Sequence, residues 1–381
     1  MYKEIPNVPS VQLFDHLKLR ASVAVVGHEN YTEFFLTDIR TTITISLQAQ
    51  VADMLFSLDG KKTVEEWIIY NKIEHIPVED ILHLLNFLRS KCILLQIDCS
   101  YPNTYKKHKR LFAFLENYCE TTSQVLTRFK RIDSSCVMII GLGAVGTWVT
   151  QSLAMAGVRS LILVDPDKVE LSNLHRQVGF RQSDVGRLKV EAFAEYLDER
   201  YEGLQLVKIV DILDEGFFYR NPYKPTLIIN SADYPSVDVT SKIVGEYAME
   251  HGIAHCIGGG YNLHQSLVGQ IVIPGQTACV ECFRLELEEI NVIDTTNIRR
   301  LDNPYRKVGS LPPLSTLSAA ITSNEAIKYI AGLDCFTMTN SRTEFSLRDM
   351  NFKTIKFRRR PECKYCGCDG KYYRFQGDSN K

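Results

Sequence analysis

The sequence predicts an α/β protein, in which a Rossmann-like domain with a mostly parallel sheet follows a smaller α+β domain. A glycine-rich turn over 141–146 joins an apolar strand-like run to a helix-like run, and strand-like and helix-like segments then alternate up to about residue 261. The first hundred residues lack this alternation. Such alternation is typical of a parallel sheet covered by helices on both faces.

The composition excludes several classes of protein. A chain of 381 residues is long enough for two or three domains, and its formal net charge of −1 gives no global attraction to nucleic acid or to an anionic membrane. It has no run of about 18 apolar residues, as a membrane span requires, and the N-terminal segment has no apolar signal-peptide core. We therefore expect a cytoplasmic protein that binds neither nucleic acid nor membranes.

Residues 1–97 predict a small winged-helix-like domain. The expected elements, in order, are strands over 21–27 and 32–37 that form a hairpin, a helix over 46–58, a second helix that Thr63 caps with Glu66 three residues on, and a helix that runs into a strand over 77–96. The alternative is an accessory domain that only adds core. The polar and basic segment 98–109 is the expected linker to a domain over 110–381.

The expected elements of the larger domain follow the linker in a regular order. They are a helix over 111–132, a strand, glycine turn and helix over 136–158, a strand over 160–167, a helix over 184–201, strands over 204–212 and 225–233, a helix over 239–252 and a strand over 254–261.

The glycine turn predicts a nucleotide. Gly141, Gly143 and Gly146 follow a strand and open a helix, whose backbone N–H groups attract phosphate. Asp165 ends the next strand, where a carboxylate accepts hydrogen bonds from ribose hydroxyls. NAD and ATP satisfy these features equally well.

A polar cluster favours ATP. Asn173, Arg176 and Gln177 follow the second strand, and Lys189 lies in the first turns of the next helix. A triphosphate needs such cations and donors, and Asp233, at the end of another strand, suits Mg²⁺. Taken singly, the two cations are surface charges and Asp233 a turn residue more often than not; the set favours nucleotidyl transfer over hydride transfer.

Four of the eleven cysteines form two pairs with metal-ligand spacing. Cys279 and Cys282 make one C-x-x-C pair, and Cys363 and Cys366 the other, each expected in a loop. Four thiolates in this spacing favour a closed structural zinc site; a redox pair is the alternative. Cys368 is a further thiol able to compete as a ligand. The remaining cysteines that we expect as buried free thiols are Cys92, Cys136, Cys256 and Cys335.

These motifs together resemble the ThiF/MoeB/HesA family, the adenylating enzymes of the ubiquitin-activating type. The resemblance covers about residues 110–366 and includes GLGAVG, Asp165, "NLHRQ", "DVGRLK", "SAD", both cysteine pairs and the late segment 312–332. It implies ATP–Mg²⁺ binding and conversion of a carboxylate into an acyl-adenylate.

The resemblance also assigns roles to residues. It places Arg176, Gln177 and Lys189 on the phosphates, Asp165 on the ribose and Asp233 on Mg²⁺. It further implies an arginine supplied across a homodimer, for which the candidate is Arg110, with Arg128 and Arg131 as rivals.

Two features depart from the sulfur-carrier and ubiquitin-like activators. Residues 283–314 contain no cysteine, which argues against a thioester or persulfide step in that segment. Residues 1–97 resemble the peptide-recognition domains of enzymes that modify ribosomally made peptides, which bind a leader peptide as an added edge strand. We expect that contact at 22–45.

The combination resembles the peptide-adenylating enzymes of microcin C and pantocin A biosynthesis. It implies ATP-driven activation of glutamate side chains in a precursor peptide, followed by attack of backbone amides and loss of water. Three alternatives remain: a sulfur-carrier-protein adenylyltransferase, a non-catalytic peptide-presenting partner and, last, an NAD oxidoreductase. The sequence leaves open the general base and the choice between adenylation and phosphorylation.

Overall fold

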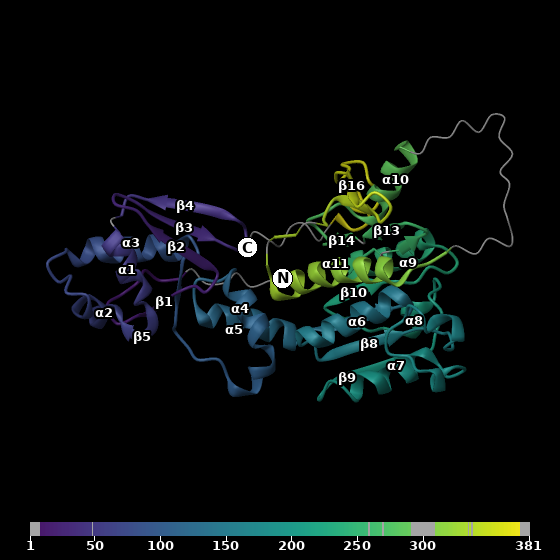
Figure 1. The fold of residues 1–381 in the computed structure, drawn as a ribbon. Coiled ribbons are helices and arrows are strands. Elements are labelled where there is room, and N and C mark those ends of the chain that lie inside the picture. The colour runs from purple at the N-terminus through teal and green to yellow at the C-terminus, as the bar shows by residue number, and fades with distance from the viewer. Residues whose placement is uncertain are drawn as a thin grey trace. The chain divides into compact units, whose positions relative to one another are not determined.

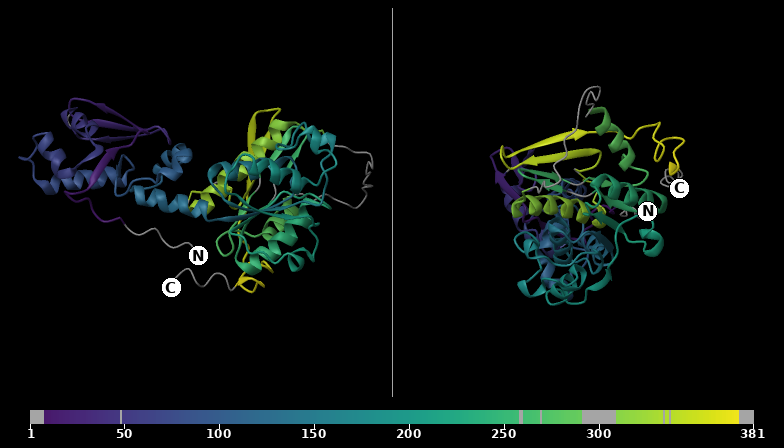
Figure 2. Two further views of the ribbon diagram at one scale, coloured as in Figure 1. Left: turned by 90° about the horizontal axis from the view of Figure 1, so that it is seen from below. Right: turned by 90° about the vertical axis from the view of Figure 1, so that its right-hand side faces the viewer.

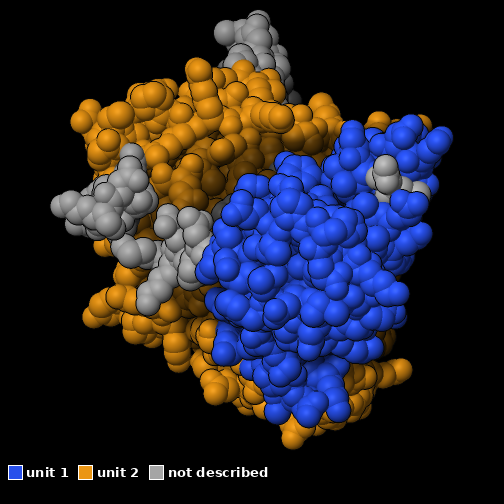
Figure 3. Space-filling view, turned by 90° about the vertical axis from the view of Figure 1, so that its left-hand side faces the viewer, with its two compact units in different colours: residues 1–130 blue, residues 131–381 orange. Residues whose placement is uncertain are grey.

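The computed structural model describes residues 8–47, 49–257, 260–268, 270–290, 309–333, 335–336 and 338–373. The chain divides into two compact units, residues 1–130 and 131–381, which are coloured separately in Figure 3. Each unit is described by itself below, with the element labels of Figure 1. Among the described residues, no helix combines the length and apolar character needed to cross a membrane.

The first unit contains two small antiparallel sheets and several helices. One sheet has the order β5-β1-β6 and the other the order β2-β3-β4. The strands are β1 (His16–Leu19), β2 (Val23–Gly27), β3 (Thr32–Leu36), β4 (Thr41–Ile45), β5 (Asp59–Thr63) and β6 (Leu94–Gln96). The helices are α1 (Ala49–Phe56), α2 (Val64–Tyr70), α3 (Val78–Ser90), the 3₁₀ helix η1 (Asn103–His108), α4 (Lys109–Glu116) and α5 (Thr122–Asp133), which runs past residue 130.

The capping signal at the start of α2 is confirmed. Thr63 accepts a hydrogen bond from the Glu66 backbone N–H, and the Glu66 side chain accepts one from the Thr63 backbone N–H. This reciprocal pair satisfies two N–H groups that the first turn of a helix leaves open. The amphipathic helices then bury their apolar faces, with Trp67 and Leu85 packing in one core with Phe34.

The predicted order of elements in this unit is incomplete. The hairpin is present as β2 and β3, which pair from Val23 with Leu36 to Gly27 with Thr32. The structure adds three strands that the sequence reading missed: β1, β4 and β5. The helix expected over 111–132 is two helices, α4 and α5, which the irregular segment 117–121 separates.

The second unit is built on a six-stranded sheet with the order β14-β11-β10-β7-β8-β9. Five strands are parallel, and β14 runs antiparallel to β11 at one edge. Its strands are β7 (Cys136–Ile140), β8 (Ser160–Val164), β9 (Gln205–Ile209), β10 (Leu227–Asn230), β11 (Ala254–Cys256) and β14 (Ile271–Val272). The predicted mostly parallel α/β domain is therefore confirmed.

Helices cover both faces of this sheet, as Figure 2 shows. The helices of the whole unit are α6 (Ala144–Ala156), the 3₁₀ helices η2 (Leu171–Asn173) and η3 (Gln182–Asp184), α7 (Lys189–Asp198), α8 (Phe217–Arg220), α9 (Val237–His251), α10 (Val280–Ile290) and α11 (Pro312–Ala331). Successive strand residues point to opposite faces. One set, which includes Met138 and Ile162, packs with Phe217 and Val244 of α8 and α9.

A second, antiparallel sheet was not expected. It consists of β12 (Gly260–Asn262), β13 (Gln265–Val268), β15 (Ser341–Ser346) and β16 (Asn351–Lys356), in that order. Helix α11 packs against both α6 and β13, so it joins the two sheets of the unit. The single strand expected over 254–261 is accordingly two strands, β11 and β12, which belong to different sheets.

The buried-thiol prediction is right only for Cys256, which lies in β11 and is 1% exposed. The other three thiols are half-buried. Cys92 has a positive φ of 56° in the turn after α3, Cys136 is the first residue of β7, and Cys335 follows α11.

Candidate functional site

A cleft of about 850 Å³ opens at the carboxyl ends of the central strands of the larger sheet. Since β8 and β10 flank β7 on opposite sides, the chain leaves β7 where the strand order reverses, which is where open α/β sheets bind ligands. Most of the predicted site residues line this cleft. They are Gly141, Gly143, Asp165, Asn173, Arg176, Gln177, Lys189 and Asp233.

Each of the three glycines of the turn meets a different structural requirement. Gly141 has a φ of +92°, and a Cβ there would lie 2.8 Å from the backbone of Ala232. Gly143 precedes α6, and no atom lies within 4 Å of a Cβ built on it, so the backbone is open toward the cleft. Gly146 does not line the cleft; a Cβ there would lie 1.9 Å from the Gly141 carbonyl oxygen. The absence of a side chain at Gly146 thus allows α6 to pack closely on the turn.

Asp165 fixes the glycine turn from the end of β8. One of its carboxylate oxygens accepts a hydrogen bond from the Leu142 N–H at 2.6 Å, and the other accepts one from the Asp167 N–H at 2.8 Å. The residue is 4% exposed. Burial raises the pKa of Asp165, and the nearby Lys189 opposes that rise. The carboxylate is thus positioned, with lone pairs left for a further donor.

The loop after β8 folds into η2 and carries the polar cluster. Asn173 is buried, and its side-chain oxygen accepts a hydrogen bond from the Glu170 N–H at 3.0 Å, which closes the turn. Arg176 donates to the Ser172 carbonyl at 2.7 Å. Gln177 is 7% exposed, and its Oε1 has no hydrogen-bond partner among the described residues.

Lys189 is the first residue of α7 and lies among acids. Its ammonium is 2.9 Å from Asp167 Oδ2 and 3.7 Å from Asp165 Oδ1. The lysine side chain is only 8% exposed. The position predicted for Lys189, at the start of a helix and at the carboxyl edge of the sheet, is confirmed.

Asp233 lies in the loop after β10 and is exposed at the rim of the cleft. Its neighbour Ser231 carries a buried hydroxyl without a hydrogen-bond partner among the described residues. Helix α9 begins after this loop, where the Ser236 hydroxyl accepts a hydrogen bond from the Val239 N–H. The cap thus fixes the loop on which Asp233 lies.

The sequence reading missed several residues of the cleft. Asp167 follows Asp165 by two residues in "DPD", and the sequence analysis gave this second acid no role. Other lining residues were given no role from the sequence, namely Lys168, Glu170, Asp211, Ser231 of the "SAD" motif and Tyr234. Among the described lining residues, carboxylates outnumber cations by five to three.

Arg110 lies outside this cleft. It is an exposed residue of α4 in the first unit. The role expected for it is in a partner's site, so the single chain leaves it a prediction, as it does for the rivals Arg128 and Arg131.

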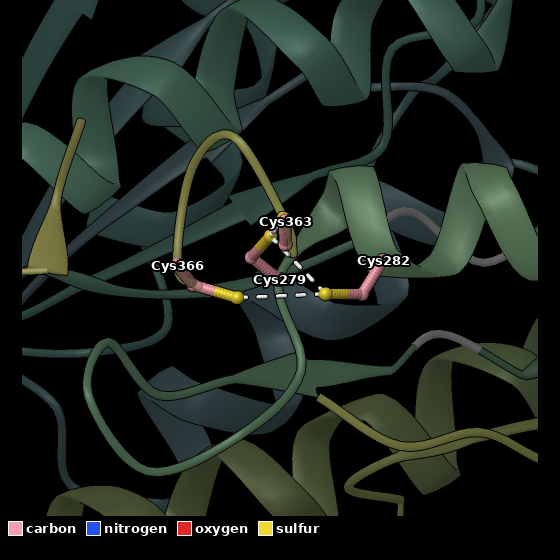
Figure 4. Close-up of side chains that lie close together, drawn as sticks. All are labelled: Cys279, Cys282, Cys363 and Cys366. Carbon is pink, nitrogen blue, oxygen red and sulfur yellow. Dashed lines mark hydrogen bonds between the residues drawn. The ribbon is translucent and has the colours of Figure 1, made fainter. Parts of the chain in front are cut away.

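The two cysteine pairs form one buried cluster. Figure 4 shows the four sulfur atoms of Cys279, Cys282, Cys363 and Cys366 pointing toward one another, and all four lie within 4.8 Å of each other. The separations are 3.6 Å between Cys279 and Cys363, and 3.4 Å between Cys282 and Cys366. Tetrahedral zinc with Zn–S bonds of about 2.3 Å needs sulfur separations of about 3.8 Å. The four side chains therefore fit a zinc ion.

A backbone group outside the cluster also faces one of its sulfur atoms. The Arg360 backbone N–H points at the Cys282 sulfur at 3.4 Å. Contrary to the prediction of two loops, Cys282 lies in the first turn of α10. Cys368 is exposed and is not part of the cluster.

The chain belongs to the ThiF family, whose profile matches residues 118–365. The sulfur carrier protein ThiS adenylyltransferase of Escherichia coli is 25% identical over 243 residues, which is 62% of this chain and 88% of that protein. The NEDD8-activating enzyme E1 catalytic subunit of Caenorhabditis elegans is 30% identical over 165 residues, 40% of this chain, and the match spans only 37% of that longer protein.

Solved structures share the fold over nearly the whole chain. MccB of E. coli, solved with ATP, superposes with a TM-score of 0.72 at 20% identity, over 92% of this chain and 99% of MccB. PaaA superposes with a TM-score of 0.66 at 20% identity, over 89% of this chain and all of PaaA. MccB has also been solved in complex with N-formylated MccA.

Proposed function

We propose that this ThiF-family adenylating enzyme activates glutamate side chains of a ribosomally made precursor peptide with ATP. Backbone amides of the peptide then attack the activated carboxyl groups, which cyclises the peptide with loss of water. The product class is a peptide antibiotic of the pantocin type. The enzyme works in the cytoplasm as a homodimer.

The observation that carries the proposal is that one cleft gathers a glycine turn, a ribose-type acid and cations. These groups come from three separate loops, after β7, β8 and β10, and from the start of α7. The volume of about 850 Å³ exceeds what a nucleotide alone requires, so a peptide carboxylate has room beside it.

The residues take the roles that their positions allow. The N–H groups at the start of α6, next to Gly143, face the phosphates, and Asp165 accepts from the ribose hydroxyls. Arg176, Lys189 and the Gln177 amide group contact the phosphates and stabilise the charge that develops on the leaving pyrophosphate. The exposed Asp233 is the Mg²⁺ ligand, since a carboxylate and water-accessible space suit that ion.

The charge of the cleft supports binding of the nucleotide with its metal. Carboxylates outnumber cations among the lining residues that the structure describes, so a free triphosphate meets repulsion. Mg²⁺ would supply the neutralising charge. The zinc ion of the four-cysteine cluster would have a structural role, because four protein thiolates leave it no open position for a substrate.

The chemistry follows from the poor reactivity of a carboxylate. One carboxylate oxygen bonds to the α-phosphorus, and pyrophosphate leaves. The peptide N–H nitrogen then attacks the carbonyl carbon, the C–O bond to the nucleotide breaks, and AMP departs with the former carboxylate oxygen. The amide proton goes to solvent. The enzyme gains most by holding the two peptide groups close together while water is excluded.

Residues 1–97 are proposed to bind the leader part of the precursor. In the three-stranded sheet β2-β3-β4, both outer strands fall in the 22–45 region where we expect an added strand. An outer strand offers unpaired N–H and C=O groups to an extended peptide. This chain shares its fold with MccB, which has been solved in complex with N-formylated MccA, and this likeness of fold supports this part of the proposal.

The homodimer would complete the site with an arginine from the second copy. Arg110 is the candidate because it is exposed and precedes the glycine-turn strand in the chain. Its guanidinium would add a cation to a cleft in which acids are in excess.

A sulfur-carrier-protein adenylyltransferase is the alternative function. It is favoured by the similarity to the ThiS adenylyltransferase, which covers 88% of that protein. Against it stand the absence of cysteine from residues 283–314 and the presence of an N-terminal unit. A non-catalytic, peptide-presenting role is disfavoured because Arg176, Lys189 and Asp233 are all present in one cleft.

Mass spectrometry of a precursor peptide incubated with enzyme and ATP–Mg²⁺ tests the proposal. We expect the loss of one or two waters from a glutamate-containing precursor, with AMP and pyrophosphate as the other products. The same core without its leader is the matched control and should react far more slowly. ¹⁸O placed in the glutamate carboxylates should appear in AMP.

Other outcomes point elsewhere. A stable nucleotidyl-peptide without water loss would rule out cyclisation. Adenylation of a Gly-Gly carboxyl terminus, with no change in precursor peptides, would favour the sulfur-carrier alternative. Label in inorganic phosphate, with ADP formed, would replace adenylation with phosphorylation.

A further inference from the structure

The side chain of Asp167 covers the cation that a triphosphate would need. Asp167 Oδ2 accepts from the Lys189 ammonium at 2.9 Å, a shorter contact than the 3.7 Å between Lys189 and Asp165. All three side chains line the cleft. The lysine proposed to face the phosphates is therefore engaged by two acids.

The backbone holds these residues next to each other. The Lys189 N–H donates to the Asp167 carbonyl at 2.9 Å, and the Val169 N–H donates to the Arg187 carbonyl at 2.8 Å. The segment after β8 thus runs antiparallel to the segment before α7, with a bridge between Lys168 and Leu188. The pairing of Asp167 with Lys189 is a consequence of this ladder.

The two acids differ in their freedom to move. Asp165 has a 5% exposed side chain that is fixed by two backbone N–H groups. The Asp167 side chain is 66% exposed and can turn into solvent at low cost. When a phosphate approaches Lys189, Asp167 is the partner that leaves, because a lysine ammonium has only three donors and phosphate oxygens compete for them.

We infer that Asp167 is a positioning residue that holds Lys189 at the wall of the cleft and competes with the phosphates of ATP for it. The inference rests on the proposed function, since it needs a triphosphate in this cleft. Asp167 keeps the long lysine side chain extended along the cleft wall, at the expense of affinity for the nucleotide. ATP–Mg²⁺ replaces one carboxylate on the ammonium by phosphate.

Calorimetric titration of Asp167→Asn with ATP–Mg²⁺ and with adenosine tests the inference. Removing the competing charge should tighten ATP binding by roughly threefold to tenfold. Adenosine has no phosphate, so its affinity should stay within about twofold of the unsubstituted protein.

Two further variants separate this mechanism from general effects. Glu191→Gln removes a charge from the same end of α7, but Glu191 pairs with Lys208 and does not line the cleft, so ATP affinity should stay unchanged. In a Lys189→Gln background, Asp167→Asn should change ATP affinity by less than about twofold, because the contested ammonium is gone.

Three results would overturn the inference. Weaker or unchanged ATP binding by Asp167→Asn would show that the carboxylate does not compete. An equal gain in the Lys189→Gln background would show that Asp167 simply repels phosphate. Equal gains for adenosine and ATP would indicate a change in the fold of the cleft. An unsubstituted protein that binds no ATP would overturn the proposed function as well, whereas the first three results leave it intact.

Discussion

Asp233 is an exposed carboxylate in the loop before α9, and its proposed role as the Mg²⁺ ligand leads to a specific prediction. Asp233→Ala should lower ATP turnover by about 100-fold or more, because the magnesium-bound phosphates lose their protein ligand. Leader-peptide affinity should stay within about twofold, since the leader is proposed to bind residues 1–97. Pyrophosphate release and fluorescence anisotropy of a labelled leader measure the two effects. Turnover at the unsubstituted rate would remove Asp233 from the site.

His255 should make the protein sensitive to acid. It is 1% exposed in β11, and burial lowers its pKa to about 4 from the usual 6.5. Between these values protons bind the unfolded chain but not the folded one, so the free energy of unfolding falls as the pH drops from 6.5 to 4. For this histidine the loss is about 3 kcal/mol.

A His255→Leu variant should lose less stability over this pH range than the unsubstituted protein. Urea unfolding of both proteins at pH 7, 5.5 and 4.5 gives the comparison. Other effects of acid, such as protonation of cysteine thiolates, occur in both proteins and cancel when their stabilities are compared at the same pH. Parallel stability curves for the two proteins would contradict the burial argument.

At the residue scale, the sequence predicted the members of the cleft that belong to local motifs. Gly141, Asp165 and Lys189 are recognisable because each has a fixed place relative to a strand or helix end. The Lys189–Asp167 contact could not be predicted, since it joins residues that are 22 positions apart in the sequence. The predicted role of Gly146 in nucleotide binding stays a prediction; in the structure Gly146 packs closely on Gly141.

At the scale of elements, two glycines of one turn should respond differently to the same substitution. Gly146→Ala would drive a methyl group into the Gly141 carbonyl oxygen and should destabilise the protein by about 3 kcal/mol or more. Gly143→Ala has open space around the new Cβ, so stability should change by less than about 1 kcal/mol while ATP affinity falls. Urea unfolding and calorimetry measure both effects, and equal stability losses would contradict this division of roles.

The elements that the sequence predicted well are those with strong local periodicity. The helices α6, α7 and α9 and the buried strands β7, β8 and β10 fall in this group. Strands β13 and β15 were missed because their pairing joins Gln265 with Ser346, far apart in sequence. Strand β5, with the sequence DGKKT, has no apolar alternation, and only its pairing with β1 makes it a strand.

At the scale of the whole molecule, the cysteine cluster should govern stability. Removal of metal with a strong chelator under reducing conditions should lower the melting temperature by several degrees or more, because the cluster joins α10 to the later loop that carries Cys363. Calorimetry and zinc analysis of the dialysed protein measure this. Cys368→Ser should retain the metal, since Cys368 lies outside the cluster. An unchanged melting temperature after full metal loss would exclude a structural role.

The separation of 84 positions between Cys279 and Cys363 also has a consequence during synthesis. At roughly 5–20 residues per second, the ribosome makes the second pair on the order of ten seconds after the first. In that interval the first two thiols are available to oxidants and to foreign soft metals. A nascent chain therefore depends on a reducing environment until the loop with Cys363 and Cys366 has been made. Expression under oxidative stress should yield more protein with incorrect disulfides than the same stress applied to the folded protein.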